Sequence, residues 1–177
     1  YHIKRYELDN YEADDIIGTL SRQADEEDFE TIIITGDRDL TQLATDNVTI
    51  YYTKKGVTDV DHYTPKFIAE KYNGLVPKQI IDMKGLMGDT SDNIPGVAGV
   101  GEKTAIKLLN QFESVEGVYE HIEEVTAKKL KEKLINSKDD ALMSKDLATI
   151  NVHSPIEVSL EDTKLTLQDD TTEKIEL

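Results

Sequence analysis

The chain has 177 residues, 38% of them hydrophobic and 32% charged, a balance typical of a soluble globular protein with one core and space for a small appendage. It has no cysteine, no apolar run long enough to cross a membrane and no signal-peptide pattern. These absences exclude disulfides, thiolate metal sites and a cysteine nucleophile, and they fit a cytoplasmic protein. The net charge of −16 argues against nucleic acid as a partner, unless lysines cluster locally or divalent cations offset clustered carboxylates.

The first half of the chain alternates between predicted strands and helices. The alternation in YHIKRYEL predicts a strand over 1–8, and a helix capped by Asp9 or Asn10 is expected to run from there to about Glu27. The sequence TIIIT over 31–35 is typical of a strand covered on both faces, as in a parallel sheet. The elements expected next are a short helix over 37–44, two paired strands over 47–53 and 57–60 with a turn at 54–56, and helices over 65–73 and 78–87.

The second half of the chain is expected to be mostly helical. The predicted helices cover 102–112, 115–122, 127–136 and 138–150, and Pro155 ends this region. We therefore predict an α/β fold in three parts. Residues 1–87 would form an α/β core with a mostly parallel sheet flanked by helices, 88–153 a helical subdomain, and 154–177 a weakly structured exit segment.

A glycine-rich hairpin, GVAGVG over 96–101, precedes the helix that begins at Glu102. Glycine lets a partner approach the backbone closely, and the free N–H groups at a helix start favour an anion such as phosphate. This pattern predicts a helix-hairpin-helix, which grips a nucleic-acid backbone without reading bases. The alternative is a glycine-rich turn that only caps the helix. The candidate DNA-binding residues are Gly96, Gly99, Val100, Gly101, Lys103, Thr104 and Lys107.

Seven carboxylates are expected at one end of the α/β part, close to the hairpin. They are Glu12, Asp14, Asp15, Asp37, Asp39, Asp89 and Asp92. Taken in pairs they have simpler explanations, because acids complement helix starts and aspartates cap helices and turns. Taken together they would repel one another, and a divalent ion removes that penalty. A ligand set made only of carboxylate oxygens indicates Mg²⁺ or Mn²⁺.

Three motifs resemble the 5′-nuclease (flap endonuclease) family: YEADD over 11–15, TGDRD over 35–39 and GDTSDNIPG over 88–96. They are most similar to the 5′→3′ exonuclease domains of bacterial DNA polymerase I, over nearly the whole chain. The resemblance implies a PIN-like core, two divalent ions held by the seven carboxylates, and a hairpin that grips duplex DNA behind the cleavage point. It also implies catalytic roles for Asp14, Asp15, Asp37 and Asp39, and a monovalent cation, K⁺, at the hairpin.

By the same resemblance, the reaction would be hydrolysis of phosphodiester bonds near DNA 5′ ends, during replication and repair. The substrate would be duplex, flap or nicked DNA of any sequence, and the protein a bacterial, nucleoid-associated monomer that contacts no membrane. A polymerase region would follow Leu177. The family's first strand, with its metal-binding aspartate, and its basic helical arch do not precede Tyr1. We therefore expect this chain to be the C-terminal part of the domain, with weak or no activity by itself.

Two other functions stay open. A non-catalytic duplex-DNA-binding module would suit a chain without the family's N-terminal metal ligands. A phospho-acceptor signalling domain also clusters acids at strand ends, but it needs a strand-end lysine and has no use for the hairpin. The basic run over 128–133 is a second candidate for a DNA-binding surface. The four histidines are scattered along the chain and are expected to be surface residues.

Overall fold

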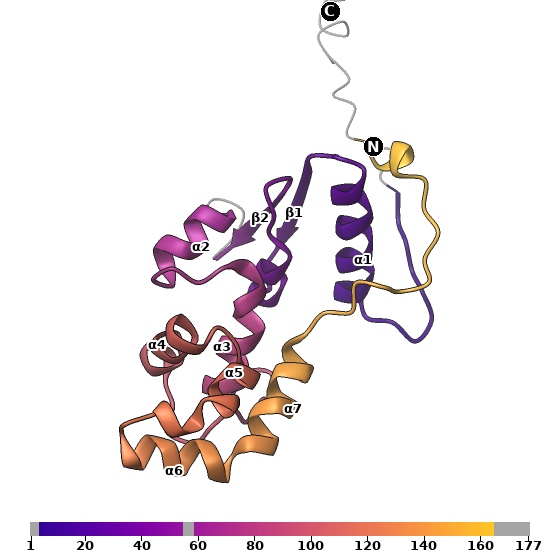
Figure 1. The fold of residues 1–177 in the computed structure, drawn as a ribbon. Helices are drawn as coiled ribbons and strands as arrows, with labels where there is room; N and C mark the ends of the chain where they lie inside the picture. The colour runs from indigo at the N-terminus through magenta and orange to yellow at the C-terminus, as the bar shows by residue number, and fades with distance from the viewer. Residues whose placement is uncertain (1–3, 55–58, 165–177) are drawn as a thin grey trace, which may run out of the picture.

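The computed structural model describes residues 4–54 and 59–164 (Figure 1). The first elements are α1 (Ala13–Glu26), β1 (Thr31–Thr35), the 3₁₀ helix η1 (Arg38–Leu43), β2 (Val48–Thr53), β3 (Val60–Tyr63) and α2 (Pro65–Lys71). The others are η2 (Pro77–Gln79), α3 (Ile80–Met87), α4 (Glu102–Phe112), α5 (Val115–Glu120), η3 (Ile122–Glu124), α6 (Lys128–Asn136), α7 (Lys138–Ala148) and η4 (Leu160–Thr163). The predicted α/β class is confirmed, and none of the helices described has the length and hydropathy needed to cross a membrane.

The three strands form one small mixed sheet in the order β1-β2-β3. Strand β1 pairs with β2 in parallel, and β2 pairs with β3 in antiparallel orientation. The register aligns Ile33 with Ile50 and Ile50 with Tyr63, and all three side chains are buried on the same face. The pairing of β2 with a following strand is therefore confirmed. Residues 57–58 of the predicted partner strand lie outside the described residues.

The prediction that β1 is covered on both faces is wrong. Ile32 is 51% and Ile34 is 72% exposed, whereas Ile33 between them is buried. Successive side chains of a strand point to opposite faces, so one face of β1 packs on the core and the other is open. Strand β1 also lies at an edge, with β2 as its only strand partner in the described ranges. An apolar β-branched run indicates a strand, but it does not indicate what covers each face.

The N-terminal predictions need correction as well. Residues 4–8 form no strand, and residues 1–3 lie outside the described ranges. Helix α1 begins at Ala13 after Glu12, and neither Asp9 nor Asn10 caps it. Asn10 has a φ of 67°, a left-handed conformation that suits a turn, and this turn postpones the start of the helix. Three predicted helices also end earlier than expected, α2 at Lys71, α5 at Glu120 and α7 at Ala148.

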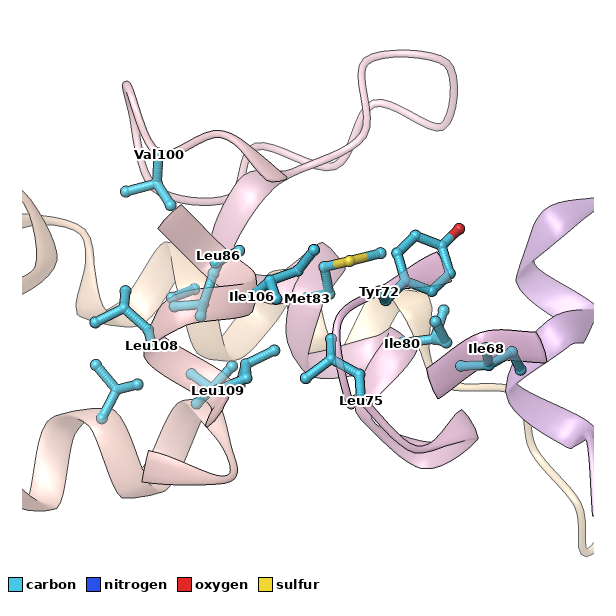
Figure 2. Packing of buried hydrophobic residues seen from close by; sticks show 14 of the residues in the cluster. Ile68, Tyr72, Leu75, Ile80, Met83, Leu86, Val100, Ile106, Leu108 and Leu109 are labelled. Atoms are coloured by element: carbon cyan, nitrogen blue, oxygen red, sulfur yellow. The ribbon is translucent and has the colours of Figure 1, made fainter. Parts of the chain in front are cut away.

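The helical part packs around α3. Figure 2 shows Leu86 of α3 and Leu109 of α4 in one cluster of buried side chains, and both are almost fully buried. Helix α7 lies against the other side of α3, where Gly85 allows close contact. A Cβ atom on Gly85 would lie 3.0 Å from the Cβ of Lys145 and 3.1 Å from the carbonyl oxygen of Ala141. This packing fixes the end of α3, from which the acidic loop begins.

After α7 the chain returns along α1, as the orange segment in Figure 1 shows. The backbone N–H of Asn151 donates to a carboxylate oxygen of Asp15 at 3.1 Å, and the N–H of Ser154 donates to the hydroxyl of Thr19 at 2.9 Å. Gly18 permits this approach, because a Cβ there would lie 2.8 Å from a methyl group of Ile150. The return segment therefore holds the acidic start of α1 in position. The exit segment beyond residue 164 lies outside the described ranges.

Candidate functional site

Three carboxylates converge on the ammonium group of Lys84. Asp39 belongs to η1, and Asp89 and Asp92 belong to the loop after α3. One oxygen from each of the three lies within 4.8 Å of the others. Lys84 forms ion pairs with Asp39, with Asp89 at 2.9 Å and with Asp92 at 3.5 Å, and its own side chain is only 11% exposed. We call these three carboxylates the acid trio.

The loop that carries two members of the acid trio is closed by its own backbone. Helix α3 ends at Met87, and the φ of 72° at its C-cap Gly88 turns the chain out of the helix. Asp89 and Ile94 then exchange two backbone hydrogen bonds of 2.8 Å. The carboxylate of Asp89 accepts hydrogen bonds from the N–H of Ser91 at 2.9 Å and from its hydroxyl. A Cβ on Gly96 would overlap the backbone of Gly88, so this glycine is needed for the loop to close.

The pKa values of Asp39 and Asp89 shift in opposite directions. Hydrogen bonding by Ser91, followed by Lys84, lowers the pKa of Asp89 to about 2. Burial raises the pKa of Asp39, and the charges of Asp37 and Asp92 add to this effect against the opposing effect of Lys84. Burial alone would lower the pKa of Lys84, but its hydrogen bonds to Asp39 and Asp89 raise it instead. Three ionised carboxylates around one ammonium leave an excess of two negative charges, which one divalent cation would balance.

The other four predicted metal ligands belong to the start of α1 and to the corner after β1. The pKa of Asp14 is raised by burial first, and then by the negative charges of Asp37, Glu12, Asp39 and Asp15. The first turn of α1 and the corner after β1 therefore lie within electrostatic reach of each other. Among the described residues, however, only the acid trio meets at metal-ligand spacing. The metal roles of Glu12, Asp14, Asp15 and Asp37 remain predictions.

Two of these four carboxylates also have structural roles. Asp37 accepts a hydrogen bond from the N–H of Asp39 at 2.8 Å and so caps η1. One oxygen of Asp15 accepts from the N–H of Glu12 at 3.3 Å, and the other accepts from Asn151 at 3.1 Å. A carboxylate has about four acceptor positions, so these bonds leave capacity for a metal ion.

Sequence-based reasoning missed Lys84. The available signal was a lysine within the mostly apolar helix IIDMKGLM, which comes shortly before Asp89 and Asp92. A buried lysine requires a negative partner. Asp82, the nearest acid in the chain, pairs with Lys145 instead, and Asp89 and Asp92 were already candidate ligands.

The glycine-rich hairpin lies at the start of α4. The N–H of Gly96 donates to the buried hydroxyl of Ser144 in α7 at 2.9 Å, which anchors the hairpin to the helical part. Val97 and Val100 are buried, so Val100 can offer a partner only its backbone. Gly101 precedes α4, and nothing lies within 4 Å of the position that its Cβ would occupy. The hairpin thus has a buried apolar side and an open backbone side.

The other predicted hairpin residues lie on the first turns of α4. Lys103 and Lys107 are exposed, and Thr104 is partly buried. Within the described part of the chain, neither lysine forms an ion pair, so both charges remain available to a partner. The structure therefore presents these predicted residues together on one exposed surface.

A cavity of about 340 Å³ lies beside Asp89 and the first residue of α4. Arg38, Lys84 and Asp89 line one part of it, and Glu102, the first residue of α4, lines another. Burial raises the pKa of the lining residue Tyr72 to about 12. Asp89 of the acid trio and the first residue of α4 thus line the same concave surface.

The chain matches two protein-family descriptions that together cover nearly all of it. Residues 1–73 match "5′-3′ exonuclease, N-terminal resolvase-like domain", and residues 75–171 match "5′-3′ exonuclease, C-terminal SAM fold". DNA polymerase I of Bacillus subtilis (strain 168) is 66% identical over 160 residues, which are 90% of this chain and 18% of that protein. DNA polymerase I of Chloroflexus aurantiacus is 43% identical over 170 residues, again 18% of its length. The chain thus spans less than a fifth of these relatives.

Solved structures share the fold. A T5 5′-exonuclease with bound divalent zinc ions has a TM-score of 0.74 and 23% identity, over 85% of this chain and 54% of that one. A bacteriophage T5 D15 flap endonuclease in a pseudo-enzyme-product complex with DNA and metal ions has a TM-score of 0.67 and 23% identity, over 83% of this chain and 52% of that one. At this level of identity the likeness establishes the architecture alone.

Proposed function

The chain belongs to the 5′-3′ exonuclease family, and we propose that it supplies metal-binding and duplex-gripping parts of a 5′→3′ nuclease domain within a longer DNA polymerase I. The reaction would be hydrolysis of phosphodiester bonds near DNA 5′ ends, in flap or nicked duplexes of any sequence. The observation that carries this proposal is the acid trio, one member of which, Asp89, lines a cavity that also reaches the first residue of α4.

We propose that the acid trio binds a divalent cation, Mg²⁺ or Mn²⁺, because its donors are all carboxylate oxygens and its charge excess is two. Divalent ions at such a site supply Lewis-acid activation of a water molecule and charge stabilisation for the departing oxygen. Glu12, Asp14, Asp15 and Asp37 would complete the ligand set. Asp14, Asp15, Asp37 and Asp39 would take the catalytic roles that the family resemblance implies.

Lys84 would position the trio. It donates hydrogen bonds to Asp39 and Asp89 from the buried side, and so keeps carboxylates from two distant segments facing each other. This arrangement would reduce the repulsion that three carboxylates at this spacing otherwise suffer. The residues would therefore be held near their binding geometry before an ion arrives.

The hairpin would hold the sugar–phosphate backbone. The start of α4 is open and presents N–H groups outward, and Lys103 and Lys107 add positive charge beside it. Contacts of this kind position a duplex and carry no sequence information. We further propose that a monovalent cation, K⁺, can assist binding at the hairpin backbone.

The experiment is a cleavage assay on 5′-flap DNA with Mn²⁺, using the full-length protein that contains this chain. Asp89→Asn and Asp92→Asn should each lower the rate by about 10²-fold or more, because losing a ligand misplaces the reacting groups. Asp46→Asn is the matched control, because Asp46 is exposed and precedes β2, at the opposite end of the sheet from Asp39. A rate unchanged by Asp89→Asn and Asp92→Asn would leave only a DNA-binding role.

The phospho-acceptor alternative has less support. A lysine does lie beside the acids, as that class requires, but Lys84 comes from helix α3 and not from a strand end. Incubation with acetyl phosphate should therefore leave no stable modification on Asp39 or Asp89.

A further inference from the structure

Helix α6 places a lysine directly on the glycine-rich hairpin. A Cβ atom built on Gly99 would lie 2.5 Å from the Nζ of Lys133 and 3.5 Å from its Cε. The ammonium group therefore occupies the space that a side chain at position 99 would fill. The φ of Gly99 is 77°, so this residue also adopts the left-handed conformation that favours glycine.

The charge of Lys133 is not neutralised by the protein. Lys133 is exposed, and in the described ranges its ammonium group forms no ion pair and donates no hydrogen bond. Its neighbour on the helix, Lys131, is tied to Glu123. The chain has a net charge of −16. A lysine without an acidic partner beside the open backbone is therefore a local positive charge in a molecule that is negative overall.

The hairpin backbone beside Lys133 also lacks acceptors. The N–H groups of Ala98, Gly99 and Gly101 have no hydrogen-bond partner among the described residues. The N–H groups of Val97 and Val100, by contrast, are paired with the carbonyl oxygens of Leu86 and Val97. Several donors and one positive charge thus lie together without an acceptor, which is the chemistry of an anion site.

We propose that Lys133 is a phosphate ligand of the hairpin and binds, together with its free backbone N–H groups, a phosphate of the DNA backbone. This inference rests on the proposed role of the hairpin in gripping duplex DNA. It joins α6 to the hairpin as one binding surface, together with the exposed Lys103 and Lys107 of α4. It also gives Gly99 a second role, because any side chain there would displace the ammonium group.

The other lysines of α6 provide a matched comparison. Lys128 is exposed on the same helix and forms no ion pair in the described part of the chain, but it lies five residues before Lys133, about 140° around the helix axis. Lys128→Gln and Lys133→Gln therefore each remove one positive charge from α6, at positions that face different directions around the helix axis. A general basic face would make the two variants equal, whereas a specific phosphate contact would separate them.

The test measures binding of a labelled blunt duplex of mixed sequence by the chain, in EDTA, between about 50 and 200 mM salt. Lys133→Gln should weaken binding several-fold and reduce the slope of log K against log salt by about 0.9, the value for one phosphate contact. Lys128→Gln should change the slope by less than half as much. Lys133→Arg should retain most of the affinity, and thermal melting should be the same for all variants.

A slope for Lys133→Gln equal to that of the wild type, or equal to that of Lys128→Gln, would overturn the inference. Gly101→Ala separates this result from failure of the hairpin proposal. If Gly101→Ala weakens binding and Lys133→Gln does not, only the role of Lys133 is wrong. If neither variant weakens binding, both the hairpin grip and the role of Lys133 are wrong.

Discussion

The ammonium group of Lys84 lies 2.9 Å from the Oδ2 of Asp89, across the turn that ends α3. The two residues are close in the sequence, and their ion pair connects helix α3 to the start of the acidic loop. Lys84 also contacts Asp39, which belongs to a different segment. A single buried cation therefore connects the two halves of the candidate metal centre.

We predict that Lys84→Met destabilises the chain in EDTA by about 2 kcal/mol, because it leaves three carboxylates facing one another without a counter-charge. Saturating Mn²⁺ should recover part of this loss, since an ion that binds only the folded state stabilises it. Urea unfolding with and without Mn²⁺ measures both effects. Lys78→Met, at an exposed position in η2, is the control. Equal stability of Lys84→Met and wild type in EDTA would contradict the positioning role of Lys84.

The two hairpin glycines should behave differently. Gly101→Ala adds a methyl group where nothing lies within 4 Å, so folding should be unaffected while duplex binding falls by roughly tenfold, or about 1.4 kcal/mol. Gly99→Ala should lose both folding stability and duplex affinity. The φ of 77° at this position costs an alanine about 1–2 kcal/mol, and the added Cβ displaces Lys133. Urea unfolding and duplex titration of the same samples would distinguish them. Full affinity in Gly101→Ala would mean that the hairpin backbone does not approach DNA.

Local sequence patterns predicted where helices and strands lie better than they predicted what packs against them. Strand β1 and helix α4 have the predicted bounds, because both depend on residues that are neighbours in the sequence. The pairing of Asp39 with Lys84 was not predictable, because it depends on how α3 packs beside η1. The exposure of Ile34 was missed for a similar reason, since composition indicates a strand but not what packs against each of its faces.

The open face of β1 leads to a prediction about solubility. Ile34→Thr should change the free energy of unfolding by less than about 0.5 kcal/mol, because Ile34 is 72% exposed and threonine keeps the β-branched shape. It should also reduce concentration-dependent association, since an apolar edge strand favours pairing between copies. Ile33→Thr is the buried counterpart and should cost about 2–3 kcal/mol. Light scattering over a concentration series and urea unfolding would test this contrast. A similar loss of stability in both variants would mean that Ile34 is covered in solution.

The last prediction concerns the ion network that joins α3, α5 and α7. Lys145 lies 2.7 Å from Asp82 and 2.7 Å from Glu116, and Asp82 also accepts the N–H of Val115 at 2.9 Å. Asp82 is almost fully buried, so removing its cation leaves a charge that water cannot reach. Lys145→Met keeps the side-chain stem and should cost about 3 kcal/mol, or roughly 6–12 °C in melting temperature.

The pH dependence of stability tests the same network. Burial alone would lower the pKa of Lys145, but hydrogen bonds to Asp82 and Glu116 raise it above its usual value of 10.5. Its stabilisation is therefore complete below the unfolded-state pKa and is lost as pH rises through the higher folded-state value. For Glu116, burial alone would raise the pKa, but Lys145 lowers it below 4.5. Its stabilisation is present above the unfolded-state pKa and is lost as pH falls through the lower folded-state value.

Lys145→Met should therefore flatten the stability profile at both ends, relative to wild type measured in parallel. Adding Asp82→Asn to Lys145→Met should recover at least about 1 kcal/mol, because it removes the uncompensated buried charge. Urea unfolding from acid to alkaline pH, for wild type and both variants, supplies the measurements. If the double variant is no more stable than Lys145→Met, the loss comes from packing at the α3–α7 contact and not from the charge of Asp82.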